Sequence, residues 1–306
     1  MSAILEVQNV NKEFTMGGIF SRKKVHAVMD ASFSILEGEP EVFTIVGESG
    51  SGKTTLARMI LGLETVTSGS IRVGHVDVTQ KQTRTDKLTF MRHIQPVFQN
   101  PFEAFNPLKE VDRYLESTAR VMAGLQDKQA IDEAMDAALQ KVGLSLVEIR
   151  GRFSHELSGG QLQRVAIARA LIPEPSILVA DEPVSMVDAS LRMSIVNLLR
   201  DLRDQFGVTV LYITHDLATA YYVSDRIMIM QKGKIVEMGP AQIILENPEH
   251  PYTKLLKDSV LSVQGIGESE IQPADHRLAE EAERISGTGV MTQREDGRFV
   301  RLQKTS

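Results

Sequence analysis

The segment Gly47–Thr54 (GESGSGKT) has the residue types and the spacing that bind a phosphate chain, since it matches G-x-x-x-x-G-K-[ST]. Glycines let backbone N–H groups approach phosphate oxygens, and a helix that begins at the lysine adds partial positive charge. We expect Lys53 to reach the terminal phosphates and Thr54 to hold Mg²⁺. The structural alternative is a glycine-rich turn that binds nothing, and a chance match in this strand-to-helix context is improbable. The expected nucleotide contacts are Gly47, Ser49, Gly50, Ser51, Gly52, Lys53, Thr54 and Thr55.

An acidic pair, Asp181 and Glu182, directly follows the apolar run Ile177–Ala180. Open α/β sheets bind ligands at the carboxyl ends of their strands, so these carboxylates are placed for chemistry. We expect Asp181 in the Mg²⁺ shell and Glu182 as the general base or water-orienting group. The alternative for such a pair is a solvated turn, but the preceding apolar run favours the end of a strand.

Apolar patterning predicts the elements that position these groups. The runs Val42–Val46 and Val208–Ile213 are typical of strands buried on both faces of a parallel sheet. Residues 101–153 have a helical, polar-rich pattern. A helix is also expected from Lys53, with one apolar stripe formed by Leu56, Met59, Ile60 and Leu63. These elements predict an α/β fold with a parallel sheet and a helical insertion.

The N-terminal region has a weaker pattern. A strand is expected around Ile4, Val7 and Val10, and another over Ala31–Leu36. Between them, Gly17–Lys24 is glycine-rich and then basic, and it is expected to be a loop.

Composition excludes several classes of function. The chain of 306 residues has no cysteine, which excludes disulfides and thiolate metal sites. Its formal net charge of −6 gives no support to general nucleic-acid binding, and no nucleic-acid partner is expected. No segment approaches the roughly 18 apolar residues of a membrane span, and the N-terminus lacks a signal-peptide pattern. If the chain serves a membrane, other chains span it.

The segment Leu157–Gln161 (LSGGQ) is a glycine-rich turn that opens a helix, with Ser158 as the N-cap. By itself it could be only a helix cap. In this order and context it resembles the signature sequence of ABC ATPases, and the resemblance extends to about Leu256. Gln99 then resembles the family's Q-loop glutamine, which contacts the metal or the water, and His215 resembles the switch histidine.

Two further positions resemble the family's pattern. Phe14 stands where the family places an aromatic residue on adenine, and Ser185–Asp188 resembles the D-loop. The resemblance implies a head-to-tail dimer with each ATP between one phosphate loop and the other subunit's signature segment. The contacts implied for that second face are Ser158, Gly159, Gly160, Gln161 and Asp188.

The implied fold is a P-loop NTPase ABC cassette with a parallel core sheet, an antiparallel β subdomain and a helical subdomain. We expect the ABC domain at 1–260, with its helical subdomain at about 101–170. A C-terminal extension at 261–306 should carry a helix over Ala274–Arg284. It should also carry a β-hairpin, because Val290–Gln293 and Arg298–Leu302 flank the turn dipeptide Asp296-Gly297.

The segment Asn247–Leu256 (NPEHPYTKLL) resembles the end of the cassette in the oligopeptide/dipeptide/nickel importer class. The loop Gly17–Lys24 resembles the second ATPase subunit of that class. The resemblance implies an ATP-hydrolysing motor, peripheral on the cytoplasmic face of the inner membrane. Its implied partners are two permease subunits, a second ATP-binding subunit and an extracytoplasmic substrate-binding protein. A heterodimer of ATPases is expected, with a homodimer as the alternative.

The motifs do not identify the transported substrate. Peptides are the default cargo of the class, and oligosaccharides, opines or nickel are the alternatives. An exporter motor is less favoured because of the segment Asn247–Leu256. A soluble ABC ATPase of DNA repair or translation is also less favoured, since long coiled coils and a second cassette are missing. The D-loop departs from the usual pattern at Met186-Val187.

Overall fold

The computed structural model describes residues 2–17, 23–185, 187–264 and 273–303, arranged in two compact units. Unit one contains Met1–Leu5, Ile35–Pro40 and Arg72–Tyr212. Unit two contains the remaining segments Glu6–Ser34, Glu41–Ile71 and Ile213–Ser306. Among the described residues, no helix combines the length and the apolar composition that crossing a bilayer requires.

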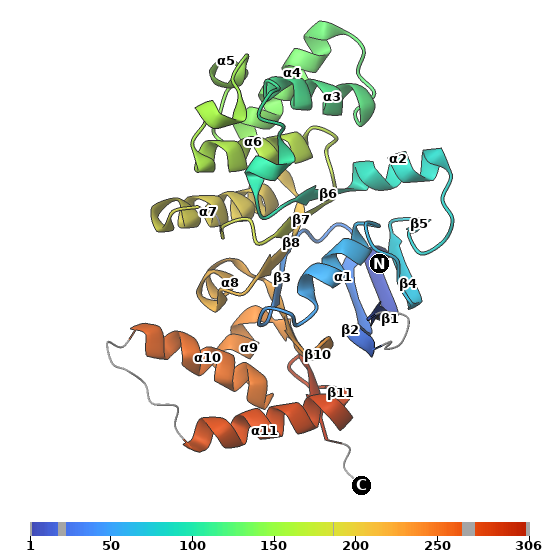
Figure 1. The fold of residues 1–306 in the computed structure, drawn as a ribbon, viewed down its shortest axis with the longest axis vertical. Helices are drawn as coiled ribbons and strands as arrows, with labels where there is room; N and C mark the ends of the chain where they lie inside the picture. Colours follow the sequence, from blue (N-terminus) through green and yellow to red (C-terminus); the bar gives the residue numbers. More distant parts are fainter. Residues whose placement is uncertain (1, 18–22, 186, 265–272, 304–306) are drawn as a thin grey trace. The chain divides into compact units, whose positions relative to one another are not determined.

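Unit two contains the strand that precedes the phosphate loop and the strands that extend its sheet on one side. They lie in the order β11 (Val290–Gln293), β12 (Phe299–Leu302), β10 (Lys234–Pro240), β9 (Arg226–Gln231) and β3 (Val42–Val46) (Figure 1). β3 and β9 are parallel, with Ile45 opposite Met228, and the other pairs are antiparallel. Every residue of β3 is buried, which confirms the strand predicted from its apolar run.

The helices of unit two complete its core. α1 (Lys53–Ile60) follows the phosphate loop. After β8 (Thr209–Thr214) come α8 (Leu217–Val223), α9 (Ala241–Glu246), α10 (Pro251–Gln264) and α11 (Pro273–Thr288). One buried cluster joins β3, β9, β10 and all four of these later helices, and it includes Val46, Tyr252 and Ala282. The C-terminal helix α11 therefore contributes to the same hydrophobic core as the phosphate-loop strand.

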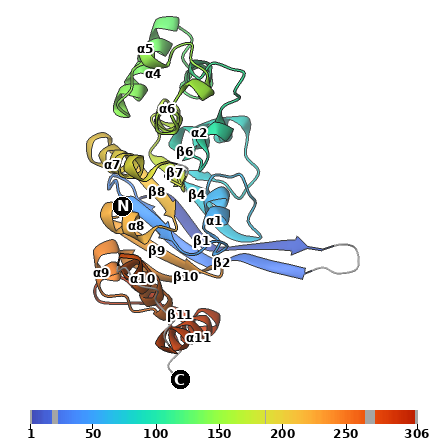
Figure 2. The same cartoon turned by 60° about the vertical axis from the view of Figure 1, so that its left-hand side comes forward.

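A smaller sheet is formed by β1 (Ala3–Met16), β2 (Lys23–Leu36), β4 (Ser68–Val73) and β5 (Val76–Asp77). β2, β1 and β4 lie side by side (Figure 2). β5 pairs antiparallel with the end of β4. Val7 and Val10 are both buried although they are three residues apart, because Asn9 has a positive φ of 47° and interrupts the alternation. The strand expected around Ile4 is present; Ile4 itself is half-buried, and Leu5 is completely buried.

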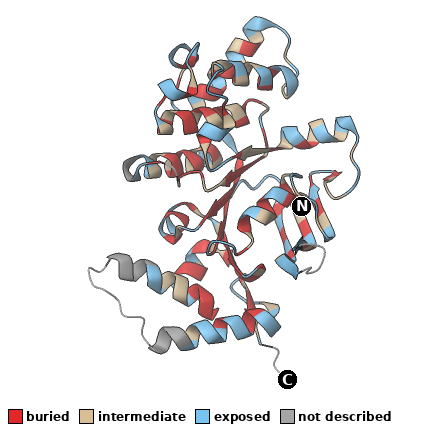
Figure 3. Ribbon diagram, in the orientation of Figure 1, coloured by how far each residue is buried: buried red, intermediate tan, exposed pale blue. Residues whose placement is uncertain are grey.

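Unit one holds the helical region and the strands that lead into Gln99 and the acidic pair. Its strands are β6 (Ile94–Val97), β7 (Ile177–Asp181) and the part of β8 (Thr209–Thr214) up to Tyr212. Its longer helices are α2 (Arg84–His93), α3 (Asp112–Val121), α4 (Lys128–Lys141), α6 (Gly159–Leu171) and α7 (Ala189–Phe206). The short ones are η1 (Pro101–Ala104), α5 (Leu146–Ile149) and η2 (Ser154–Glu156). In Figure 3 strands β7 and β8 are drawn as buried almost throughout, whereas α3 and α4 each have exposed residues on one face.

The structure corrects several sequence expectations. α1 ends at Ile60, so Leu63 lies beyond the helix. Leu63 is 51% exposed and is not part of a buried stripe. Gly62, with φ of 64°, breaks the helix before the predicted stripe is complete. α2, β6, β9 and β10 were not predicted individually. Of the expected loop Gly17–Lys24, residues 18–22 lie outside the described part, and Lys23 and Lys24 already belong to β2.

The described part of the C-terminal extension contains the predicted helix and hairpin. α11 spans the expected helical range, and β11 pairs antiparallel with β12. The turn is one residue longer than the two-residue turn suggested by Asp296-Gly297. The Arg294 N–H donates to the Arg298 carbonyl at 2.8 Å, which leaves Glu295, Asp296 and Gly297 in the loop. Gly297 supplies the positive φ of 83° that closes it.

Candidate nucleotide site

The phosphate loop joins the buried strand β3 to helix α1, as its sequence predicts. Two of its glycines admit no side chain. A Cβ on Gly47 would lie 2.2 Å from the Met230 carbonyl oxygen, and a Cβ on Gly52 would lie 2.3 Å from the Ala27 carbonyl oxygen. Gly52 also has a φ of 105°, which disfavours any L-residue. Neighbouring backbone therefore fixes the loop against β9 and β2.

Lys53 is 5% exposed, and its ammonium lies inside the loop. Nζ donates to the Gly47 carbonyl at 2.6 Å, to the Glu48 carbonyl at 2.7 Å and to Ser51 Oγ at 3.4 Å. Two backbone carbonyl oxygens thus hold the buried ammonium inside the loop. A phosphate chain bound by this loop would lie next to that positive charge. Contact of Lys53 with the terminal phosphates stays a prediction.

The remaining loop residues surround that charge. Ser49, Gly50 and Thr54 are exposed, whereas Ser51 is buried. The first turn of α1 contains no acidic side chain, and Gly52 offers it no side-chain cap. The partial positive charge of this helix N-terminus is therefore not neutralised by a cap from its own first turn, which suits an anion.

The acidic pair stands at the end of β7, as expected. Val97 of β6 lies opposite Ala180 of β7 in a parallel register. Gln99 and Glu182 each follow two residues later, and Gln99 Nε2 donates to Glu182 Oε2 at 3.2 Å. Glu182 has a positive φ of 47°, a backbone conformation that costs on the order of 1–3 kcal/mol in a residue with a side chain.

The segment after Glu182 folds back on it. The Ser185 N–H and Ser185 Oγ both donate to the Glu182 carbonyl, at 3.2 and 3.0 Å. Met186 lies outside the described residues, Val187 is buried, and exposed Asp188 precedes α7 as its N-cap residue. The expected D-loop is thereby tied to the backbone of the expected catalytic glutamate.

The signature segment caps helix α6. Ser158 Oγ accepts from the Gln161 N–H at 3.2 Å, and Gln161 Oε1 accepts from the Ser158 N–H at 3.0 Å, which is a capping box. Ser158 is exposed. A Cβ on Gly160 would lie 2.9 Å from Leu191 Cδ1, whereas Gly159 has open space around it. The cap that the sequence suggests is present, and it leaves the serine side chain at the surface.

Two residues expected at the nucleotide, His215 and Phe14, lie in unit two but far from the phosphate loop in the sequence. His215 is exposed between β8 and α8, where Asp216 caps α8 by accepting from the Ala218 N–H at 2.9 Å. Phe14 is half-buried in β1, and Lys12 Nζ lies 4.8 Å from its ring centroid. Lys12 itself bonds Glu64 Oε1 at 2.7 Å.

The predicted residues are divided between the two units. Unit two holds the phosphate loop, Phe14 and His215. Unit one holds Gln99, the acidic pair, the signature segment and Asp188. Sequence reasoning missed one residue at the loop, Tyr252, whose Oη accepts from the Glu48 N–H at 3.0 Å. Local pattern carries no signal for such a contact between residues 204 positions apart.

Comparison with known proteins identifies the family. Residues 28–185, half of the chain, match the family described as "ABC transporter". The chain belongs to the ABC transporter family. As a member it is an ATPase that binds ATP. Residues 236–287 of this ABC ATPase also match the family described as "Oligopeptide/dipeptide transporter, C-terminal region".

Relatives of this ABC ATPase cover most of its length. It is 38% identical over 257 residues to "Oligopeptide transport ATP-binding protein AmiF" of Streptococcus pneumoniae, covering 84% of this chain and 81% of the relative. It is 38% identical to "Oligopeptide transport ATP-binding protein OppF" of Bacillus subtilis, over 84% of this chain and 82% of that protein. "Dipeptide transport ATP-binding protein DppF" of Haemophilus influenzae is 38% identical, with 78% and 72% covered.

Solved ABC structures have the same fold. The ATP-binding cassette MJ0796, in a dimeric post-hydrolysis state bound to ADP and Pi, matches with a TM-score of 0.67 and 27% identity. That match covers 78% of this chain and 98% of the cassette. CbiO1 of Clostridium perfringens, part of the complex cbiONQ, matches with a TM-score of 0.69 and 25% identity, covering 87% and 100%. These matches confirm the predicted ABC cassette fold.

Proposed function

We propose that this ABC ATPase is the motor subunit of an importer of di- and oligopeptides. The match of residues 236–287 to the oligopeptide/dipeptide transporter C-terminal region carries this proposal. The names of the relatives AmiF, OppF and DppF support it. Oligosaccharides, opines or nickel remain the alternative cargoes of the class, because the ATPase subunit is not the part that binds the cargo.

At the nucleotide, Lys53 binds the terminal phosphates together with the backbone of Gly47–Gly52. The buried, loop-held position of Lys53 Nζ supports this role. Ser49, Ser51, Thr54 and Thr55 line the same loop and the start of α1 and complete the phosphate contacts. Phe14 stacks on adenine; the residue is half-buried, and Lys12 Nζ lies over its ring.

The residues proposed for Mg²⁺ fit that ion by their chemistry. Thr54 offers a hydroxyl, Asp181 a carboxylate and Gln99 an amide, and Mg²⁺ prefers such oxygen ligands. Gln99 uses its N–H group on Glu182, which leaves its amide oxygen as the ligand atom. When bound, the ion would neutralise charge that develops on the phosphates.

Glu182 polarises the attacking water as general base, and His215 assists at the terminal phosphate. The hydrogen bond from Gln99 and the backbone conformation of Glu182 support a carboxylate held in one orientation. The signature segment and Asp188 act on the nucleotide of a partner ATPase. The residues proposed for that contact are Ser158, Gly159, Gly160, Gln161 and Asp188.

The assembly follows from the importer role. We propose two permease subunits, a second, different ATP-binding subunit and an extracytoplasmic substrate-binding protein, with this chain peripheral on the cytoplasmic face of the inner membrane. Its ABC domain is residues 1–260, and residues 261–306 form the extension. Purification of an active transporter with two copies of this chain and no second ATPase would contradict the heterodimer.

The proposal is tested at the loop by Lys53→Ala. This change removes the cation that Gly47 and Glu48 hold in place, so ATP binding by the full chain, measured by calorimetry, should be lost or sharply weakened. Lys128→Ala, an exposed lysine at the start of α4, is the matched control and should bind ATP normally. Equal ATP affinity of the two variants would rule out this nucleotide site.

A further inference from the structure

We propose that Tyr252, in the C-terminal region of this chain, positions the phosphate loop for nucleotide. The inference rests on the proposed role of that loop. Tyr252 lies in the first turn of α10, and its Oη accepts a hydrogen bond from the Glu48 backbone N–H at 3.0 Å. Glu48 is the second residue of the loop, directly after Gly47, the residue that follows β3.

The hydrogen bond holds the same peptide group that holds Lys53. The N–H of Glu48 and the carbonyl of Gly47 belong to one planar peptide unit. That carbonyl accepts from Lys53 Nζ at 2.6 Å, while the N–H donates to Tyr252 Oη. A rotation of this unit would break both bonds together. Tyr252 therefore fixes the orientation of the carbonyl that places the lysine ammonium.

Tyr252 is well suited to act as a fixed acceptor. Its side chain is 3% exposed and packs in the core cluster that includes Val46 and Ala220. Burial raises the pKa of Tyr252 to about 12, so the hydroxyl stays neutral over the working pH range. The backbone N–H of Tyr252 donates to His250 Nδ1 at 3.1 Å, which fixes the start of α10.

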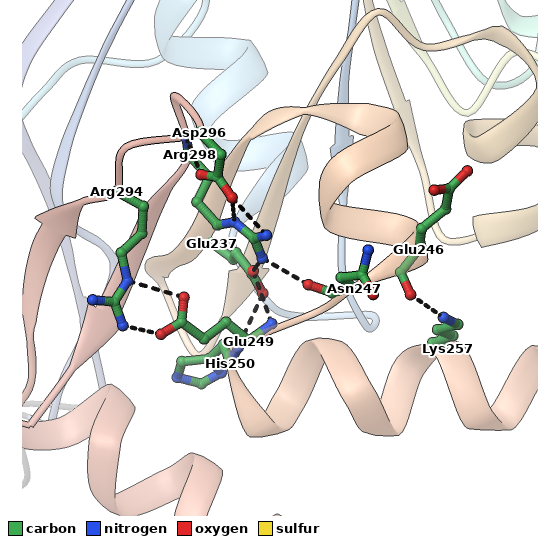
Figure 4. A network of polar contacts seen from close by, with 9 residues as sticks. All are labelled: Glu237, Glu246, Asn247, Glu249, His250, Lys257, Arg294, Asp296 and Arg298. Carbon is green, nitrogen blue, oxygen red and sulfur yellow. Dashed lines mark hydrogen bonds and ion pairs between the residues drawn. The ribbon is translucent and has the colours of Figure 1, made fainter.

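A buried carboxylate anchors the segment that carries Tyr252 (Figure 4). Glu237 of β10 is completely buried. Its Oε1 accepts from the Glu249 N–H at 3.0 Å, and its Oε2 accepts from the His250 N–H at 3.1 Å. Burial raises the pKa of Glu237, and these N–H donors oppose that rise by stabilising the carboxylate.

The C-terminal hairpin completes this anchor. Arg298 lies one residue before β12. Its Nη1 atom is 3.5 Å from Glu237 Oε1 and donates to the Asn247 carbonyl at 2.6 Å. Asp296 of the turn holds the same guanidinium at 2.8 Å. A continuous set of contacts thus leads from the hairpin through Glu237 and the start of α10 to the phosphate loop.

Preorganisation is the physical reason that this contact affects binding. A loop that is already fixed loses less conformational freedom when it closes on a phosphate chain. A neutral hydrogen bond is worth enough to change an equilibrium about two- to tenfold. Removing the Tyr252 hydroxyl should therefore weaken ATP binding by about that factor, because the nucleotide must then order the loop itself.

The test compares Tyr252→Phe with Tyr114→Phe in the full chain. Tyr114 Oη accepts from the Asn106 backbone N–H at 2.8 Å, so the control removes the same type of bond from a loop of the helical region. Three quantities are measured: ATP affinity by calorimetry, hydrogen exchange at the Glu48 amide, and the thermal midpoint. We expect weaker ATP binding and faster Glu48 exchange only in Tyr252→Phe, with similar small losses of thermal stability in both variants.

Other results would overturn the inference. Unchanged ATP affinity in Tyr252→Phe, or an equal loss in Tyr114→Phe, would show that Tyr252 contributes only to stability. Lys53→Ala, measured alongside, separates this failure from failure of the proposed function. If Lys53→Ala loses ATP binding and Tyr252→Phe binds ATP normally, only the positioning role of Tyr252 is ruled out. Normal binding in Lys53→Ala would remove the loop itself as the nucleotide site, and the inference with it.

Discussion

Gln99 Nε2 donates a hydrogen bond to Glu182 Oε2 at 3.2 Å, across the ends of two neighbouring parallel strands. The strand register places the two residues side by side, since each lies two positions beyond the pair Val97 and Ala180. The backbone of Glu182 has a positive φ of 47°, and Ser185 bonds its carbonyl. The side chain and the backbone of this glutamate are thus both constrained.

Gln99→Ala should slow hydrolysis because it releases the Glu182 carboxylate. A hydrogen bond to a charged group contributes about 1.5–3 kcal/mol, which corresponds to a fall in turnover of about 10- to 160-fold. ATP should still bind, because the phosphate loop is unchanged. Gln129→Ala is the control, since Gln129 Nε2 donates to Glu133 Oε1 at 2.9 Å on an exposed helix. Equal turnover in both variants would show that the Gln99 contact is not used in catalysis.

The sequence was sufficient to predict the loop, the strand ends and the helix cap, because each depends on short-range pattern. Val42–Val46 is a buried strand, and the capping box at Ser158 forms within its own helix turn. The bond between Gln99 and Glu182 depends on strand register, which the apolar runs do not encode. The expectation for Leu63 was wrong because Gly62 ends the helix first.

Contacts of the C-terminal region could not be predicted for the same reason. Tyr252 and Glu48 are joined by tertiary packing, and so are Arg298 and Glu237. The segment Asn247–Leu256 by itself shows only a proline-bounded turn before a short helix. Family resemblance indicated a class of transporter for this segment but assigned no role to its residues.

Ser158→Arg tests whether the signature segment acts on a partner's nucleotide. Loss of the capping box costs about 1 kcal/mol of stability, and a bulky cation at an exposed helix start should also block closure of the dimer. We expect hydrolysis by the assembled transporter to collapse, while photolabelling of this chain with an ATP analogue persists. Ser145→Arg removes the capping box of α5 and serves as the control. If turnover survives in Ser158→Arg, the segment is only a helix cap.

The buried imidazole of His250 predicts a pH dependence of stability. Burial, with the nearby charges of Arg301 and Lys254, lowers the pKa of His250 from 6.5 to about 4. Between those values the unfolded chain binds a proton that the folded chain excludes, so stability falls as pH falls from about 6.5 to 4. The full effect is on the order of 3 kcal/mol, and it is absent above pH 6.5.

His250→Asn isolates this contribution. Asparagine keeps an acceptor for the Tyr252 N–H at the start of α10 but does not titrate. The raised pKa of Glu237 acts in the opposite direction, and it is present in both proteins. Denaturant unfolding at pH 7 and pH 4.5 should show a smaller loss of stability in His250→Asn than in the wild type. Equal losses would mean that His250 is protonated in the folded protein.

Glu182→Gln tests whether Glu182 activates water at an ATP bound by the phosphate loop. Glutamine keeps the size of the side chain but removes the base, so phosphate release should fall by roughly two to four orders of magnitude. ATP bound per chain should stay at the wild-type level, because Lys53 and the loop are untouched. The decisive measurement is bound ATP and released phosphate from one preparation of the assembled transporter. Retained ATP with lost phosphate release is the predicted result. Wild-type release would show that Glu182 is not the base, and loss of ATP binding would show that Glu182 is needed to hold the nucleotide.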